Sequence, residues 1–379
     1  MSPPLPFVNL AAQTKRLRGV LDAHIGAVLD HGRFILGPEV AELEAALVAF
    51  IGARHVVGVA SGTVALQIAL MADGIGRGDA VFLPAFTFTA TAEAVLAVGA
   101  EPVFIDVDQA TCLIDVDDLA RGVETVKRAG RARPRAIIAV DLYGQPADYA
   151  RLGPLARREG LVLVADGAQS CGASLDGRRV GALAPVTALS FFPSKPLGCF
   201  GDGGALVTDE EPRAALYRSI RAHGAGTSKY DIVRLGMNGR LDTLQAAVLL
   251  AKLTVFEDEL RARERIAQRY DQALGGRVGL PGRRAGAASA WACYTIQVDR
   301  RDQVRARLAE VGIPTMVYYP APMHLQPAFA AWGGGAGSLP MSEALAARVL
   351  SLPMHAYLDE ATVDRITGAV LDALEQHPV

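Results

Sequence analysis

The sequence predicts an α/β protein with a mostly parallel sheet, and three observations indicate this class. Seven short apolar runs alternate with helical patterns between residues 56 and 208. The runs are apolar throughout, as is typical of strands buried on both faces of a sheet. The chain has 379 residues, more than most single cores hold, so a second domain is expected.

The first part of the chain accounts for the sheet. Helical patterns such as 63–72 and 149–159 separate successive apolar runs, as the crossover helices of a parallel sheet do. We therefore expect seven strands with helices on both faces. They lie at 56–60, 80–86, 102–107, 135–142, 161–165, 186–192 and 205–208.

After residue 250 the pattern changes. A long charged helix is expected over 254–274, with Glu259 and Arg263 on its polar face. A strand, a helix, a strand and two helices should follow, and Asp359 is the expected N-cap of the last helix. These later elements lie at 291–298, 302–311, 313–319, 342–350 and 359–375.

This change divides the chain into two expected domains. The large domain covers 1–253 and includes an N-terminal arm, and the small α+β domain covers 254–379. The glycine-rich segment 333–337 in the small domain is expected to be a surface loop, of the kind that can cover an active site.

The composition is that of a globular chain. Hydrophobic residues make up 51% and charged residues 21%, with a formal net charge of -2, which excludes a disordered chain and gives no sign of a nucleic-acid partner. The start lacks a basic segment followed by an apolar stretch, and no later run is long enough to span a membrane. We therefore expect a cytoplasmic protein with no membrane partner.

Motifs of several common sites are missing. The four cysteines lack the CxxC pairing of zinc and redox sites, so free buried thiols are expected. The seven histidines do not cluster at ligand spacings, and no metal is expected. No GxGxxG follows the first strand and no GxxxxGK[ST] occurs, which argues against a nucleotide-dependent dehydrogenase or kinase.

The segment Ser61-Gly62-Thr63 follows an expected strand and opens an expected helix. Free amides at a helix N-terminus, together with the helix dipole, can form a phosphate site. Serine and threonine at this place are also ordinary helix caps. On this segment alone, capping is the better-supported interpretation.

Asp166 follows the apolar run 161–165, at the edge where ligands bind in parallel sheets. A carboxylate buried there needs a partner, and a pyridinium nitrogen is one that fits. The alternative is a carboxylate that caps the next turn. The residue alone leaves both interpretations open.

Lysine is scarce: the chain has five among its 38 basic residues. Lys15 and Lys252 fall in helical patterns, and Lys127 and Lys229 in polar segments, where solvated lysines are usual. Lys195 lies between an apolar strand and a glycine-rich turn, so it alone is expected to be desolvated. Burial lowers the pKa of an amine and allows it to form a Schiff base with a carbonyl cofactor. A lysine that extends from a strand end into solvent is the alternative.

Six segments, taken in order, resemble the DegT/DnrJ/EryC1/StrS family of sugar aminotransferases. Several long motifs in one order are far more specific than any single motif. FILGPEVAELE and SLPMHAYL are similar to the family as well, so the resemblance extends over nearly the whole chain. The six segments are Ser61-Gly62-Thr63, LPAFTFTATAEA, LVLVADGAQSCGA, SFFPSKPLGCFGDGGA, GMNGRLDTLQAA and YYPAPMHLQPAF.

The resemblance implies the aspartate-aminotransferase fold (fold type I), the cofactor pyridoxal 5′-phosphate, and a homodimer whose active sites lie at the subunit interface. It implies that Lys195 carries the cofactor and moves protons, and that Asp166 pairs with the pyridine nitrogen. Gln169 would lie near the ring hydroxyl, and Phe88 would stack on the ring. The residues implied to hold the phosphate are Gly62, Thr63, Ser190 and, from the second subunit, Asn238. The residues implied to bind substrate are Arg240, which would meet a carboxylate, and Tyr318, Tyr319 and His324.

Within the family, SFFPSKPLGCFGDGGA, RLDTLQAA and SLPMH are most similar to enzymes that aminate UDP-2-acetamido-2-deoxy-3-oxo-glucuronate at carbon 3 with L-glutamate. This implies a nucleotide-sugar substrate and a 3-amino sugar for a surface polysaccharide such as the O-antigen of lipopolysaccharide. Two positions depart from the pattern. Ala165 replaces an acidic residue, and Tyr318-Tyr319 stands where those enzymes resemble His-Tyr. Because the second departure touches the implied sugar site, a UDP- or dTDP-linked 3- or 4-keto-6-deoxy hexose stays an alternative substrate.

Other functions are possible on the same fold. Lys195 argues against the sugar dehydratases that replace this lysine, and segment 333–337 lacks the reactive cysteine that a cysteine desulfurase needs. A non-catalytic binding protein is the remaining alternative. The complete set of Lys195, Asp166 and Gln169 argues against it.

Overall fold

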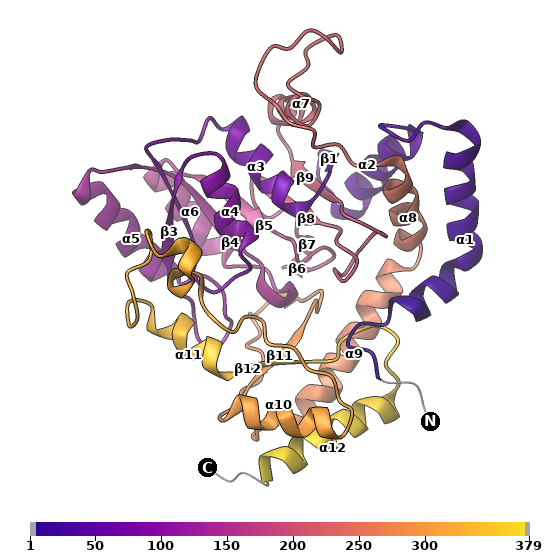
Figure 1. Ribbon diagram of the computed structural model, residues 1–379, viewed down its shortest axis with the longest axis vertical. Coiled ribbons are helices and arrows are strands. Elements are labelled where there is room, and N and C mark those ends of the chain that lie inside the picture. The colour runs from indigo at the N-terminus through magenta and orange to yellow at the C-terminus, as the bar shows by residue number, and fades with distance from the viewer. Residues whose placement is uncertain (1–4, 376–379) are drawn as a thin grey trace.

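A seven-stranded sheet lies at the centre of the computed structural model, which describes residues 5–375 (Figure 1). Its strands are His55–Val59 (β1), Asp79–Pro84 (β2), Glu101–Ile105 (β3), Arg133–Val140 (β4), Val162–Asp166 (β5), Val186–Ser190 (β8) and Gly204–Thr208 (β9). The spatial order is β1-β9-β8-β5-β4-β2-β3. β9 is antiparallel to both of its neighbours, so the other six strands run in one direction. The predicted fold class and the seven predicted strands are confirmed.

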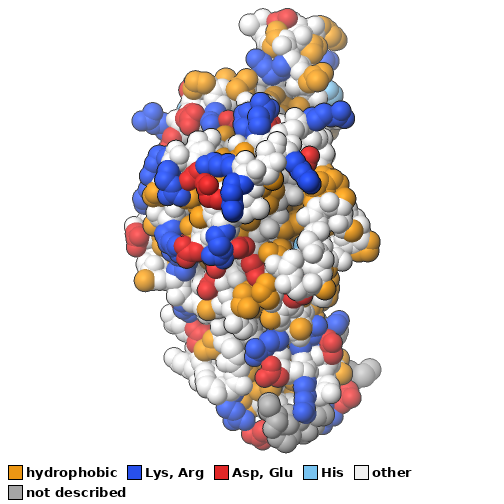
Figure 2. Space-filling model, turned by 90° about the vertical axis from the view of Figure 1, so that its left-hand side faces the viewer, with side chains coloured by type: hydrophobic (Ala, Val, Ile, Leu, Met, Phe, Trp, Pro, Cys, Tyr) orange, Lys and Arg blue, Asp and Glu red, His pale blue; other side chains and the backbone are white. Residues whose placement is uncertain are grey.

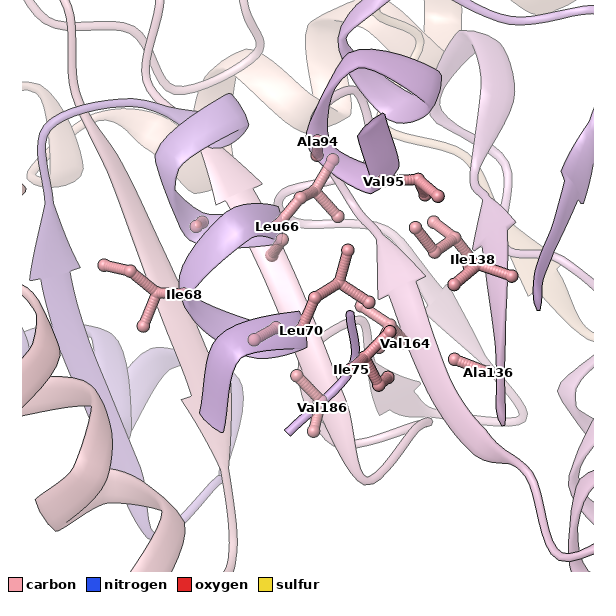
Figure 3. Packing of buried hydrophobic residues seen from close by; sticks show 14 of the residues in the cluster. Leu66, Ile68, Leu70, Ile75, Ala94, Val95, Ala136, Ile138, Val164 and Val186 are labelled. Atoms are coloured by element: carbon pink, nitrogen blue, oxygen red, sulfur yellow. The ribbon is translucent and has the colours of Figure 1, made fainter. Parts of the chain in front are cut away.

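Helices cover both faces of this sheet (Figure 1). Successive strand residues point to opposite faces, so Ile138 packs with α3 and α4 while its neighbour Ile137 packs with α5 and α6. Figure 3 shows Leu66 and Leu70 of α3 directed at Ile138, Val164 and Val186 of the strands. The helices of this part are Leu10–His31 (α1), Pro38–Ile51 (α2), Gly62–Ala72 (α3), Ala90–Ala97 (α4), Val116–Ala129 (α5), Tyr149–Glu159 (α6), Glu211–Ile220 (α7) and Thr243–Leu253 (α8).

A second apolar cluster forms the core of the C-terminal part. A two-stranded antiparallel sheet packs there against three helices, and Tyr270, Tyr294 and Ile366 are fully buried among them. Each buried side chain of this size stabilises the fold by roughly 1.5–3 kcal/mol. The elements are Phe256–Leu274 (α9), Tyr294–Gln297 (β11), Arg301–Glu310 (α10), Pro340–Arg348 (α11), Val349–Leu352 (β12) and Glu360–Glu375 (α12). Three two-residue strands elsewhere are Ser174–Leu175 (β6), Arg178–Arg179 (β7) and Ala287–Ala288 (β10).

Two predictions for the C-terminal part were wrong. Residues 313–319 form no strand, and only Met316 makes an isolated bridge, to Ser351. The partner of β11 is instead β12, which follows α11 without a turn and was therefore included in the predicted helix 342–350. The predicted N-cap is confirmed, because Asp359 Oδ1 accepts a hydrogen bond of 2.8 Å from the amide of Thr362.

The polar face predicted for α9 was also wrong in part. Glu259 and Arg263 are buried, because α1 and the segment after β12 cover this side of the helix. Phe256 of α9 packs with α1, α2 and α8, whereas Ile266 and Tyr270 pack in the C-terminal cluster. Since α9 takes part in both cores, the domain boundary at 253/254 stays a prediction.

The surface mixes charges of both signs. Acidic and basic side chains lie side by side over the face shown in Figure 2, in keeping with the formal net charge of -2. The segment after α7 extends beyond the rest of the molecule as a hairpin at the top of Figure 1, closed by a bridge between Ala225 and Ile232. Within residues 5–375, no helix has both the length and the apolar content needed to cross a membrane.

Candidate functional site

The residues predicted for the site gather at one edge of the sheet. β1, β5 and β8 run in the same direction, so their carboxyl ends meet there. Ser61 follows β1, Asp166 ends β5 and Ser190 ends β8. This is the edge at which ligands bind in parallel sheets.

The turn from β1 into α3 forms a narrow cradle. Ser61 Oγ accepts a hydrogen bond of 3.1 Å from the amide of Val64, so the predicted capping role is confirmed. Gly62 lies directly against β8, since a Cβ atom at this position would be 2.7 Å from Cβ of Ser190. The first turn of α3 has no acidic residue. The helix N-terminus therefore also has the charge and the small side chains that an anion site requires.

Asp166 is buried at the end of β5 and accepts two hydrogen bonds. Its donors are Thr91 Oγ1 at 2.8 Å and the amide of Ala168 at 3.2 Å. Burial raises the pKa of Asp166, while these two donors and the positive charge of Lys195 oppose the shift. The hydrogen bond from the Ala168 amide shows that Asp166 also caps the next turn, which the sequence left open as an alternative. The carboxylate oxygens can still accept further hydrogen bonds.

Lys195 lies in the turn that follows β8, held by a hydrogen bond of 2.9 Å from its amide to the Phe192 carbonyl. Burial lowers the pKa of its amine, and the nearby Cys293 and Asp166 oppose this shift. The residue is half-buried and its amine is desolvated, as the sequence predicted. A lysine with a lowered pKa beside a buried carboxylate is suited to nucleophilic and acid–base chemistry.

A network of hydrogen bonds connects this edge with the segment before Pro320. Gln169 Oε1 accepts a bond of 2.7 Å from the amide of Tyr143, and Gln169 Nε2 donates one of 3.2 Å to the hydroxyl of Tyr319. The hydroxyl of Tyr143 donates to the Tyr318 carbonyl. The ring of Tyr319 lies 6.0 Å from that of Phe88, centroid to centroid. Both predicted tyrosines therefore lie at the site edge.

The remaining predicted residues lie at different depths. Arg240 pairs with Val59 at the end of β1, beside the cradle, and its Nε is buried. Asn238 is exposed at the base of the hairpin.

His324 is buried, and its Nε2 lies 3.0 Å from Glu343 Oε1. Glu343 in turn accepts a hydrogen bond of 2.8 Å from the amide of Gly337, so His324 supports the glycine-rich loop.

Sequence reasoning missed three residues of this site. Thr91 bonds Asp166, Tyr143 bonds both Gln169 and the Tyr318 carbonyl, and Cys293 lies close enough to Lys195 to act on its pKa. Thr91 lies within the segment LPAFTFTATAEA, at the start of a helix that follows a parallel strand. This position, at the same sheet edge as Asp166, could have indicated that Thr91 belongs to the site. The prediction that Lys252 is solvated was wrong, because its side chain is 1% exposed.

Comparison with known proteins identifies the family. The model of the DegT/DnrJ/EryC1/StrS aminotransferase family matches residues 18–371. UDP-2-acetamido-2-deoxy-3-oxo-D-glucuronate aminotransferase of Pseudomonas aeruginosa is 44% identical, over 97% of this chain and 99% of the relative. A dTDP-3-amino-3,4,6-trideoxy-alpha-D-glucose transaminase of Streptomyces venezuelae is 41% identical, over 99% and 97% of the two chains.

Solved structures agree with this result. The crystal structure of a DegT/DnrJ/EryC1/StrS aminotransferase from Brucella abortus has a TM-score of 0.95 and 49% identity, over 97% of this chain and 99% of the other. A protein from Streptococcus pneumoniae, with a TM-score of 0.87 and 26% identity, has pyridoxal phosphate and pyridoxamine phosphate forms. The chain therefore belongs to the DegT/DnrJ/EryC1/StrS aminotransferase family and is a pyridoxal-phosphate-dependent sugar aminotransferase.

Proposed function

We propose that this aminotransferase moves the amino group of L-glutamate to carbon 3 of UDP-2-acetamido-2-deoxy-3-oxo-glucuronate. The observation that carries the proposal is the match, at 44% identity and nearly full length, to the Pseudomonas aeruginosa enzyme named for this substrate. The products are 2-oxoglutarate and a UDP-linked 3-amino sugar. Such a sugar is a building unit for a surface polysaccharide such as the O-antigen of lipopolysaccharide.

The residues present fit the cofactor. A side chain at position 62 would collide with Ser190, so glycine is what keeps the cradle open for a phosphate. The N-terminus of α3 supplies positive potential there. Gly62, Thr63 and Ser190 would hold the phosphate, and Asp166 would bond the pyridine nitrogen. Bound at this edge, pyridoxal phosphate supplies an electron sink for the carbon that loses its proton.

Lys195 has two roles in the proposal. Its amine would carry the cofactor and, once freed, would take a proton from the α-carbon of glutamate. In the second half of the reaction it would place a proton on carbon 3 of the sugar. The lowered pKa of Lys195 supports these roles, since a base must be neutral to accept a proton near neutral pH. Asp166 would keep the ring nitrogen protonated through both halves.

Substrate selection is proposed for the groups around the tyrosine pair. Arg240 would meet the carboxylate of the sugar or of glutamate, because a guanidinium binds carboxylates through two parallel hydrogen bonds. Tyr318 and Tyr319 would contact the sugar nucleotide, and Gln169, which bonds the Tyr319 hydroxyl, would also reach the ring hydroxyl of the cofactor. His324 would act indirectly, through Glu343 and the loop 333–337.

A homodimer with shared sites is part of this proposal. Apolar side chains on the hairpin are unusually exposed, with Tyr230 at 86% and Leu235 at 88%, and Phe34 and Phe200 are exposed as well. Exposed apolar patches are typical of protein interfaces. Asn238 at the base of the hairpin would then reach the phosphate bound in the second subunit.

The four free cysteines suit the reducing cytoplasm, where we place the enzyme.

A second candidate substrate is a dTDP-linked 3-keto-6-deoxy hexose. The relative from Streptomyces venezuelae, at 41% identity, carries this alternative. A sugar of this kind has no carboxylate, so it would leave Arg240 without a partner on the sugar. If Arg240 binds the carboxylate of the sugar, Arg240→Met should raise the KM for the 3-keto glucuronate and leave the KM for a 6-deoxy sugar unchanged.

An assay of the purified holoenzyme tests the proposal. We expect glutamate and the UDP-linked 3-keto glucuronate to give the amino sugar, detected by mass spectrometry, at a higher kcat/KM than any UDP- or dTDP-linked 3- or 4-keto-6-deoxy sugar. The Lys195→Ala variant should lose both the reaction and the visible absorbance of the bound cofactor, while the surface variant Lys127→Ala keeps both. Faster turnover of a 6-deoxy sugar would overturn the proposed substrate, and full activity of Lys195→Ala would overturn the role of the lysine.

A further inference from the structure

Asp141 is a second buried carboxyl beside the site, and the proposed reaction gives it no part. It directly follows β4, the strand that pairs with β5, and its side chain is completely buried. A carboxyl without solvent costs free energy unless hydrogen-bond donors surround it. The role of Asp141 can therefore be read from the groups that donate to it.

These donors come from two different segments. Oδ1 of Asp141 accepts a hydrogen bond of 2.8 Å from the amide of Ala147 and one of 2.6 Å from the hydroxyl of Tyr149, the first residue of α6. Oδ2 accepts one of 2.7 Å from Ser170 Oγ, which is also completely buried. The first two donors follow Asp141 closely in the chain and fix the direction of its carboxyl. The third connects this fixed group to the segment after β5.

The segment connected in this way, residues 166–170, carries both Asp166 and Gln169. Its first residue is held by the backbone, because the Asp166 carbonyl accepts a hydrogen bond of 3.0 Å from the amide of Asp141. Its last residue is held by the bond from Ser170 Oγ. One residue, Asp141, therefore bonds both ends of the segment. Gln169 is held from the same side, through its bond from the amide of Tyr143, two residues after Asp141.

The link between Asp141 and Ser170 does not depend on a charge. Burial raises the pKa of Asp141 to about 7, the three donors oppose this rise, and the negative charge of Asp166 adds to it. The titratable groups that face Asp141 are Tyr149 from α6 and Asp166 from β5. Both protonation states are therefore populated near neutral pH. Either state keeps the link, since a serine hydroxyl can donate to a carboxylate or accept from a protonated carboxyl.

We propose that Asp141 is a positioning residue of the cofactor site, which holds both ends of segment 166–170 by hydrogen bonds and thereby fixes the directions of Asp166 and Gln169. The inference rests on the proposed role of Asp166 as the partner of the pyridine nitrogen. A carboxylate binds a ring nitrogen well only when it is already aimed at it, since reorientation on binding weakens affinity. Without the link, the cofactor-free segment should take several arrangements.

The affinity of the cofactor-free protein for pyridoxamine phosphate, measured by titration calorimetry, tests this role. This ligand has no carbonyl, so its affinity does not depend on a bond to Lys195. Asp141→Ala should raise the Kd about tenfold and Ser170→Ala about threefold. The matched control is Asp106→Ala at the end of β3. Asp106 accepts hydrogen bonds of 2.9 and 2.7 Å from the amides of Met341 and Ser342, so its loss should lower the stability of the fold and leave the Kd unchanged.

The conservative variant Asp141→Asn separates the hydrogen bonds from the charge. Its Oδ1 can accept from Ala147 and Tyr149, and its Nδ2 can donate to Ser170 Oγ. The Kd should therefore stay within about threefold of the native value at both pH 6 and pH 8.5. A loss as large as that of Asp141→Ala would overturn the inference, because the charge would then be what matters.

The remaining outcomes distinguish the inference from the proposed function. Asp166→Ala should raise the Kd at least about tenfold. An unchanged Kd in this variant would overturn the proposed role of Asp166. A raised Kd in Asp166→Ala together with native Kd values in Asp141→Ala and Ser170→Ala would overturn the positioning role alone, since Asp141 would then only stabilise the fold. If Asp141→Ala fails to fold, Ser170→Ala and Asp141→Asn decide.

Discussion

Lys195 and Lys252 are both buried amines, but they lie in different surroundings. Burial lowers the pKa of each, that of Lys252 to about 8. Lys195 faces Asp166 at the sheet edge where the cradle of α3 is also found. The amine of Lys252, on α8, lies 4.6 Å from the ring centroid of Phe200 and has no hydrogen-bond partner within residues 5–375. A carboxylate acts on each amine, Asp166 on Lys195 and Glu259 on Lys252. A reactive amine beside a carboxylate is therefore not sufficient for a site: the anion cradle at the same sheet edge distinguishes Lys195.

Replacing each lysine with methionine gives the largest contrast. Lys195→Met should lower kcat at least about 1,000-fold, because the acid–base group is lost. Lys252→Met should stay within about threefold of the native enzyme, because the neighbours of Lys252 are Phe200, Cys199 and Glu259, none of which is proposed to bind cofactor or substrate. Steady-state kinetics at saturating glutamate measures both. Equal losses in the two variants would show that the surroundings do not separate the two lysines.

Asp166→Asn tests the carboxylate beside Lys195 at the sheet edge. The amide has the same shape but no charge, so the ring nitrogen that Asp166 is proposed to bond would lose its ionic partner. Breaking a buried pair in this way costs about 3 kcal/mol, or roughly 100-fold in kcat. The matched control is Glu101→Gln on the exposed start of β3, which should leave kcat unchanged. An Asp166→Asn variant with native kcat would remove the carboxylate from the mechanism.

The sheet and its edge could be predicted because apolar runs and crossover helices are local patterns. Lys195 and Asp166 were also found, since each follows an apolar run. Contacts between distant segments could not be predicted: Thr91, on the helix after β2, meets Asp166 only because β4 pairs with both β2 and β5 in the sheet. The desolvation of Lys252 was missed because a lysine in a helical pattern is usually solvated. Its helix is instead covered by α1 and α2.

Lys252→Met should also increase the stability of the fold in a pH-dependent way. Below pH 8 the lysine is charged in both the folded and the unfolded protein, so its burial cost is fully present. Between pH 8 and about 10.4 the folded protein has lost this proton while the unfolded chain still binds it, so native stability rises with pH. The variant should exceed the native free energy of unfolding by about 3 kcal/mol at pH 7, because the two pKa values of the lysine differ by about 2.4 units. Urea titrations at pH 7 and pH 10 should show this difference shrinking, and a constant difference would mean that the amine is not desolvated.

Thr91→Val should give the smallest effect, and it tests a neighbour of Asp166 that Lys252 does not have. The substitution keeps the shape of the side chain but removes the bond of 2.8 Å to Asp166 Oδ2. A hydrogen bond to a buried charge contributes about 1.5 kcal/mol, so kcat should fall roughly tenfold. Because Thr91 lowers the pKa of Asp166, its loss should also move the acidic limb of the kcat profile to higher pH. Thr125→Val, which removes a hydroxyl on the exposed side of α5, should change neither. A tenfold loss without any movement of the acidic limb would mean that Thr91 supports the packing of α4 and does not act through the charge of Asp166.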